Sequence, residues 1–146
     1  MSIYATLHTH PMCRPTPKPI CITRGASVQL TYPLSDKTFS VEDIEQVVFM
    51  FKQGKDLWGY SMFDDSEPGK ATKSPRFYIL EEENYSAIIF NLDGEDTKQF
   101  KPGINLKYEI TIKLNTDSLA TTGYKDSIII EPQCPIVVVD SLYSSL

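Results

Sequence analysis

The sequence predicts an all-β fold, an immunoglobulin-like antiparallel β-sandwich with one or two single-turn helices. The first observation is a strict alternation in residues 103–115, where every second residue from Ile104 to Leu114 is apolar. Strand side chains point alternately to opposite faces, so this period of two gives one apolar face. The second is that ten prolines and seven glycines punctuate the chain, which favours short strands joined by turns. A small closed barrel is the alternative architecture.

The first third of the chain predicts two strands and a helical turn. Residues 20–24 form a short strand that ends at Gly25, a turn or bulge signal. Residues 27–34 alternate, with Val28, Leu30, Tyr32 and Leu34 facing inward. Ser40 followed by acidic residues resembles an N-cap, so we expect one helical turn over residues 41–44.

The middle of the chain predicts two hairpins. Residues 47–51 are apolar on both parities, which favours a central strand covered on both faces. A turn over residues 53–56 returns the chain as a strand at 57–63. Residues 64–74 are polar and form a long loop. Residues 76–80 and 85–92 pair across the turn at 81–84.

The last third predicts one more helical turn and three strands. Residues 93–100 contain the turn, and Pro102 and Gly103 end it before the strand at 103–115. Residues 115–123 are a polar connection. The final strands lie at residues 125–131 and 136–139, separated by the breaker Pro132.

The length of 146 residues indicates one folded domain. We divide the chain into an extended proline-rich N-terminal arm at 1–17, a β-sandwich domain at 18–140 and a C-terminal tail at 141–146. Prolines fix φ and remove backbone donors, so the arm does not form a central strand. It either lies on a neighbouring subunit or is a free tail.

Composition excludes several classes of protein. The net charge of −5 argues against a duplex nucleic-acid binder, which needs a basic face. No apolar run is long enough to cross a bilayer, and the N-terminal residues lack the charged start and continuous apolar run that are typical of a signal peptide. Three cysteines, an odd count with wide spacing, fit synthesis in a reducing compartment. We therefore expect synthesis in the cytoplasm without standard export and no membrane partner.

The sequence offers no motif for catalysis. His8, His10 and Cys13 have the residue types of a zinc site, but an incidental exposed tail explains them better. These two are the only histidines, so a catalytic triad in the domain is not expected. Acidic residues at turns fit solvated charge better than a glycosidase pair or a calcium site. We expect no catalytic, cofactor-binding or metal-binding residue, and no cofactor.

Exposed aromatic residues often mark interfaces. Trp58, Tyr60 and Tyr78 are candidates for a platform that contacts a sugar or a protein. Trp58 is also a candidate for the sandwich core, although its position beside a polar loop slightly favours the surface. In the arm, Pro15 and Pro17 are candidate partner contacts, as is the loop at residues 64–74. A carbohydrate-binding module and a hydrolase that uses paired carboxylates remain the alternatives to a protein-binding role.

Three segments in order carry a resemblance: PKPICITRGASVQLTYPL, VEDIEQVVFMFKQG and NLDGEDTKQFKPG, the last leading into an alternating strand. Together they resemble a family of small phage and prophage proteins of Firmicutes, similar to the N-terminal β-sandwich module of siphophage baseplate upper proteins. The resemblance covers residues 18–139. The chain departs from the family in a longer 56–84 region, in the strand LKYEITIKL and in its N-terminal arm.

The resemblance implies a structural or assembly role in a virion and no enzyme activity. It implies that the partners are other phage structural proteins or copies of the chain itself. Repeated copies around a tail would strengthen weak contacts through valency.

Overall fold

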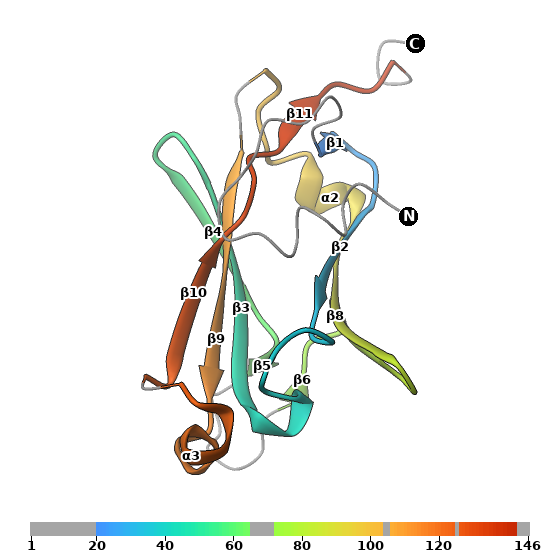
Figure 1. Ribbon diagram of the computed structural model, residues 1–146. Helices are drawn as coiled ribbons and strands as arrows, with labels where there is room; N and C mark the ends of the chain where they lie inside the picture. Colours follow the sequence, from blue (N-terminus) through green and yellow to red (C-terminus); the bar gives the residue numbers. More distant parts are fainter. Residues whose placement is uncertain (1–19, 65–71, 104–105, 125, 143–146) are drawn as a thin grey trace.

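The computed structural model describes residues 20–64, 72–103, 106–124 and 126–142, which fold as two facing sheets (Figure 1). The larger sheet has the order β10-β9-β3-β4 and the smaller one the order β2-β8-β7. The strands of the larger sheet are β10 (Ile128–Pro132), β9 (Lys107–Leu114), β3 (Ile44–Gln53) and β4 (Asp56–Ser61). Those of the smaller sheet are β2 (Val28–Pro33), β8 (Tyr85–Leu92) and β7 (Phe77–Glu82).

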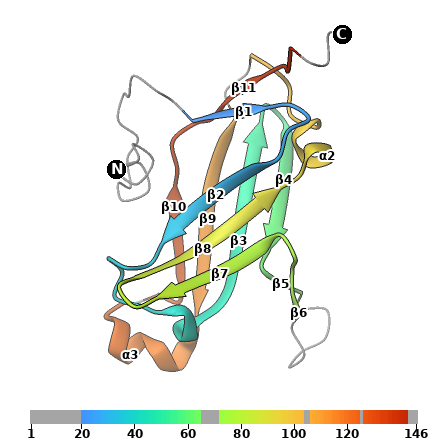
Figure 2. The same cartoon turned by 90° about the vertical axis from the view of Figure 1, so that its right-hand side faces the viewer.

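All pairs inside these two sheets are antiparallel. In immunoglobulin lettering, β2, β8 and β7 take the places of strands B, E and D, and β10, β9, β3 and β4 those of G, F, C and C′. Figure 2 shows the smaller sheet in front of the larger one, with β7 and β4 toward the same side of the sandwich. The predicted all-β immunoglobulin-like sandwich is confirmed.

Two further pairs lie outside the main sheets. At one end, β1 (Cys21–Thr23) runs parallel to β11 (Val137–Val139), which follows β10 after a short break that contains Pro135. Near the other end, β5 (Phe63–Asp64) and β6 (Thr72–Lys73) form a short antiparallel pair (Figure 1). The predicted loop at 64–74 therefore begins in β5 and contains β6, and residues 65–71 lie outside the described residues.

The alternation that predicted the fold is seen in β9. Tyr108, Ile110, Ile112 and Leu114 are buried, while the residues between them are exposed or partly so. The strand begins at Lys107, later than expected, because Leu106 makes only an isolated bridge to Ile136. A buried row on one strand against a facing sheet is the arrangement that a sandwich requires.

Aromatic rings fill the space between the sheets. Phe90 of β8 stacks on Phe49 of β3, with 4.5 Å between ring centroids, and lies 4.9 Å from Phe77 of β7. Phe51 of β3 stacks on Tyr108 of β9 at 5.5 Å. Offset and edge-to-face ring pairs add about 0.5–1.5 kcal/mol beyond the burial of their area. The ring cluster therefore fixes the two sheets face to face.

Short helices close the ends of the sandwich. The predicted turns are present as η1 (Val41–Asp43), a 3₁₀ turn, and α2 (Gly94–Thr97). Two helices were missed, η2 (Thr116–Ser118) and α3 (Leu119–Thr122), which lie in the connection expected to be a polar turn. Leu119 packs against the core and anchors this connection, a long-range contact that local polarity does not reveal.

Helix α2 is locked against the turn between β1 and β2. Gly25, at φ +84°, donates from its N–H to Thr97 Oγ1 at 2.9 Å. The same hydroxyl donates to the carbonyl of Ala26 at 2.9 Å. A side chain at Gly25 would be strained at this φ.

The described residues contain no helix that is long and apolar enough to span a membrane.

One expectation about β3 is wrong. The strand is central, between β9 and β4, but the described residues cover only one of its faces. Val47, Phe49 and Phe51 are fully buried, whereas Val48 and Met50 on the other parity are only partly buried. In the described residues no element packs over their face of the sheet (Figure 1).

Candidate protein-binding surface

Trp58 lies on the edge strand β4, and its side chain points toward the core of the sandwich. It pairs in register with Phe51 and packs edge-on against Phe100, with 5.0 Å between centroids. Its indole N–H donates to Gln99 Oε1 at 2.9 Å. The ring is partly buried, so Trp58 belongs to the margin of the core and keeps an accessible side.

Tyr60 lies two residues further along the same face of β4. Its ring contacts Phe90, with centroids 5.4 Å apart, and the guanidinium carbon of Arg76 lies 5.1 Å from its centroid. Burial raises the pKa of Tyr60, and the nearby Asp96 carboxylate adds to this rise. The phenol therefore stays neutral at ordinary pH, and its contacts are those of a ring at the sandwich edge.

Arg76 connects this edge to α2. Its guanidinium pairs with the carboxylate of Asp96, whose side chain is 8% exposed. Asp96 also accepts from the backbone N–H of Asp93 at 3.0 Å, and Asp93 accepts from the N–H of Asp96 at 2.9 Å. These bonds form a reciprocal cap at the start of α2. They hold the pKa of Asp93 below its usual value, chiefly through the backbone N–H of Asp96.

Tyr78 lies elsewhere. It pairs with Ile89 on the smaller sheet and is 55% exposed. Its neighbour Phe77 faces the core, so Tyr78 points to the outer side of β7. The three aromatic residues that formed the hypothetical platform are therefore not brought together.

Pro15 and Pro17 lie outside the described residues.

A different surface stands out on the outer side of the larger sheet, and we call it the outer-face patch. It consists of Val48 and Met50 on β3, Thr111 on β9, and Ile128 and Ile130 on β10. Val48, Thr111 and Ile130 are in register and form one row across three strands. Ile128 and Ile130 are 53% and 56% exposed. Contiguous exposed apolar groups on a sheet mark interaction sites more often than isolated ones do.

Gly59 on β4 keeps one end of the outer-face patch flat. It pairs with Met50 in register. A Cβ at this position would come within 2.8 Å of Met50 Sδ. The absence of a side chain therefore lets the thioether of Met50 lie directly against the backbone of β4. Methionine adapts readily to a partner surface because its chain is unbranched and polarizable.

Charged residues surround the outer-face patch. Lys113 on β9 pairs with Glu45 on β3 at 3.4 Å, and both side chains are about half exposed. Glu109 lies in register between Met50 and Pro132, while Lys52 and Lys107 face each other at the far end of the strands. An apolar centre with a charged rim is the usual composition of a protein–protein interface.

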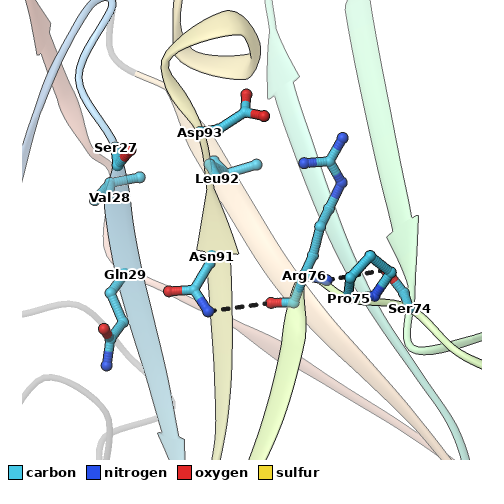
Figure 3. Close-up of a pocket in the computed structure, with 9 residues that line it drawn as sticks. All are labelled: Ser27, Val28, Gln29, Ser74, Pro75, Arg76, Asn91, Leu92 and Asp93. Carbon is cyan, nitrogen blue, oxygen red and sulfur yellow. Dashed lines mark hydrogen bonds between the residues drawn. The ribbon is translucent and has the colours of Figure 1, made fainter.

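The smaller sheet carries a hollow of about 840 Å³ that is lined by both polar and apolar residues (Figure 3). Ser27, Gln29, Asn91, Arg76 and Asp93 are among the residues that line it. Its two ionisable groups both serve the fold, because Arg76 pairs with Asp96 and Asp93 caps α2. Asn91 donates from its backbone N–H to the carbonyl of Arg76 at 2.8 Å. The side chains that line the hollow are thus held by structural hydrogen bonds.

Within the part of the chain that the structure describes, no three residues of the His, Cys, Asp or Glu types are placed to hold a metal ion. The candidate zinc residues His8, His10 and Cys13 lie outside that part. Comparison with known proteins adds no assignment: no protein-family model matches the chain, and no curated protein is significantly similar to it.

The signals for the outer-face patch were present in the sequence. Apolar residues on both parities in residues 47–51, and three consecutive isoleucines at 128–130, predict apolar groups on both faces of the sheet. Such a pattern fits either a strand covered on both sides or a strand whose outer side binds a partner. The prediction for residues 47–51 was a strand covered on both sides.

Proposed function

We propose that this chain is a non-enzymatic structural or assembly module of a phage or prophage particle, and that it binds another structural protein of the particle through the outer-face patch. The outer-face patch is the observation that carries the proposal, because Ile128, Ile130, Val48 and Met50 offer accessible apolar area on a rigid sheet. The assignment to a particle is supported by the order of the three sequence segments.

The chemistry of the outer-face patch fits a protein partner. Burying a flat apolar centre against a partner is favourable, by about 25 cal/mol per Å² of apolar surface removed from water. The lysines and carboxylates around it give orientation and selectivity, since mismatched charges oppose a wrong partner. A sugar ligand would instead use an aromatic platform, and Trp58, Tyr60 and Tyr78 do not share one surface.

The test is incorporation into particles. A strain lacking the gene is complemented with the wild-type chain or with the double variant Ile128→Thr, Ile130→Thr, which keeps β-branched side chains and so preserves the strand. Particles are purified, and copies of the chain per particle are counted by quantitative mass spectrometry. We expect the wild type at a fixed copy number and the double variant at less than about a tenth of it, a loss of about 1.4 kcal/mol or more.

The matched control is Tyr78→Thr, which removes a side chain of nearly equal exposure, 55% against 56% for Ile130, from the other sheet. This control should enter particles at the wild-type copy number. A wild-type chain that is abundant in the cell and absent from purified particles would contradict the virion role. Equal incorporation of the double variant would contradict the choice of surface.

A further inference from the structure

The edge of β4 offers an unpaired row of backbone groups. Met62 donates from its N–H to the carbonyl of Val47 on β3, at 2.8 Å, which fixes the residues of even number as those that face β3. In an antiparallel ladder the alternate residues then direct N–H and C=O the other way. Leu57, Gly59 and Ser61 therefore aim their backbone groups outward, away from the sheet.

The other edges of the two main sheets offer fewer donors. On β2 only Gln29 and Thr31 present outward N–H groups, because Pro33 has none. On β7 the N–H of Phe77 is already bound to Ser74, at 3.1 Å. On β10, Pro132 likewise has no donor. Among the strands that the structure describes, β4 is thus the edge with three outward donors in succession.

The core-facing side of β4 adds a second feature. Trp58 and Tyr60 alternate with the three outward residues and are only partly buried. A strand added to this edge would place every second side chain beside these two rings, since side chains of paired strands share faces. The site therefore fits an extended segment with flat apolar groups at every second position.

Residues 14–19 of this chain have that pattern. They read Arg-Pro-Thr-Pro-Lys-Pro, with prolines at 15, 17 and 19. Each residue before a proline is restricted to extended backbone, and each proline is fixed near φ −65°. In an extended segment of this sequence, Arg14, Thr16 and Lys18 would present their N–H groups on one side. These residues lie outside the described part of the chain, so only their sequence bears on the inference.

The two patterns match residue by residue. If Arg14, Thr16 and Lys18 pair with the outward groups of β4, their prolines lie on the same face as Trp58 and Tyr60. Proline rings pack well on aromatic rings, as in grooves that bind proline-rich peptides. The missing N–H groups would then point to solvent, where prolines are tolerated on edge strands. The added strand would also end the sheet, because it offers no donors to a further strand.

Charge favours the same pairing. Arg14 and Lys18 are the only Lys, Arg, Asp or Glu among residues 1–19, and all 19 acidic residues of the chain follow them. The cationic segment is therefore attracted to a domain with a net excess of carboxylates, which include Asp56 at the start of β4, whereas Lys52, in register with Leu57, lies on the outer side of this edge.

The short reach of the arm favours a segment from another copy. Val137 donates to the carbonyl of Ile20 at 2.9 Å, so Ile20 is fixed beside β11. Four neighbouring pairs separate Ile20 from β4. Ile20 lies beside β11, β11 lies beside the chain that leads into β9, β9 lies beside β3, and β3 lies beside β4. Four spacings make about 19 Å. The four residues from Thr16 to Ile20 span at most about 14 Å.

We propose that β4 binds residues 14–19 of a second copy of this chain as an added edge strand, with Pro15 and Pro17 against Trp58 and Tyr60. The domain is then a self-associating unit, and its proline-rich arm is the segment that joins one copy to the next.

The test compares the full chain with two variants of the arm. Thr16→Pro removes the central N–H of the segment, whereas Thr16→Ala keeps it, and neither substitution touches the described domain. Hydrogen exchange at single amides is followed by NMR at low and high chain concentration. In the wild type and in Thr16→Ala, the amides of Leu57, Gly59 and Ser61 should exchange about tenfold more slowly at high concentration. In Thr16→Pro this protection should be lost.

Light scattering of the same samples supplies the second readout. Wild type and Thr16→Ala should rise above the mass of one chain, and Thr16→Pro should not. The inference is overturned if the three amides show no concentration-dependent protection, or if Thr16→Pro keeps it. It is also overturned if Gln29 and Thr31 on β2 are protected instead. None of these results depends on the outer-face patch, so the two proposals fail separately.

Discussion

Arg76 and Asp96 join the smaller sheet to the helix that caps the sandwich. The pair stands 20 residues apart in sequence, and the guanidinium also covers the ring of Tyr60 on the larger sheet, 5.1 Å from its centroid. One side chain therefore contacts both sheets and α2, at the edge where Trp58 and Tyr60 are accessible.

Arg76→Met should lower the free energy of unfolding by about 2 kcal/mol, because it leaves the buried carboxylate of Asp96 without its cation. Urea unfolding followed by circular dichroism measures the change. The control is Lys98→Met, which breaks an exposed pair with Glu95 and should cost less than about 0.5 kcal/mol. Equal costs for the two variants would show that burial of Asp96 does not matter.

Phe90→Ala should cost about 3–5 kcal/mol, since Phe90 is fully buried and contacts four other aromatic rings. Tyr85→Ala, at the exposed start of the same strand, should change stability by less than about 0.5 kcal/mol. Thermal unfolding of both variants distinguishes a packed ring cluster from a loose one. A small effect at Phe90 would argue against the stacked core.

Tyr32→Phe should extend stability to higher pH. Burial raises the pKa of the Tyr32 phenol above its usual value, and the Glu131 carboxylate adds to this rise. The unfolded chain loses this proton near pH 10 and the folded chain only at higher pH, so the native state loses stability as pH rises above about 10. Phenylalanine removes that loss. Unfolding free energies between pH 8 and 11 should diverge in favour of the variant, and parallel curves would refute the assignment.

Asp93→Asn should reduce the decrease in the free energy of unfolding as the pH falls. The pKa of Asp93 is lowered in the folded chain, chiefly by the backbone N–H of Asp96, so its contribution is present above the usual value near 4 and disappears as pH falls through the lowered value. Asparagine also caps helices, so stability at pH 7 should change little. Denaturation series from pH 2 to 7 test this, and an unchanged acid slope in the variant would count against it.

The sequence-based expectations succeeded where periodicity was local. The alternation in β9, the turn at Gly54 and the helical turn after Asp93 are all present in the structure. Each depends on residues that are close together in the chain, and their local conformational preferences do not depend on the rest of the fold.

Contacts between distant segments were not predictable. The parallel pairing of β1 with β11 and the ion pair of Arg76 with Asp96 depend on which strands meet. The position of Val48 and Met50 depends on whether anything covers the outer side of β3, which the apolar pattern alone leaves open. The sequence likewise does not reveal that Trp58 and Tyr60 lie on one sheet and Tyr78 on the other, because this depends on how the strands are distributed between the two sheets.

The most direct measurement of the central claim is oxidative footprinting of the two methionines on either side of the larger sheet. Met50 is partly exposed in the outer-face patch, and Met62 is 1% exposed and serves as the internal control. Purified chain and intact particles are treated with the same low dose of peroxide and analysed by mass spectrometry. We predict that Met50 oxidises readily in the free chain and at least about tenfold more slowly in particles, while Met62 stays slow in both. Equal oxidation of Met50 in the two samples would contradict a docked outer-face patch.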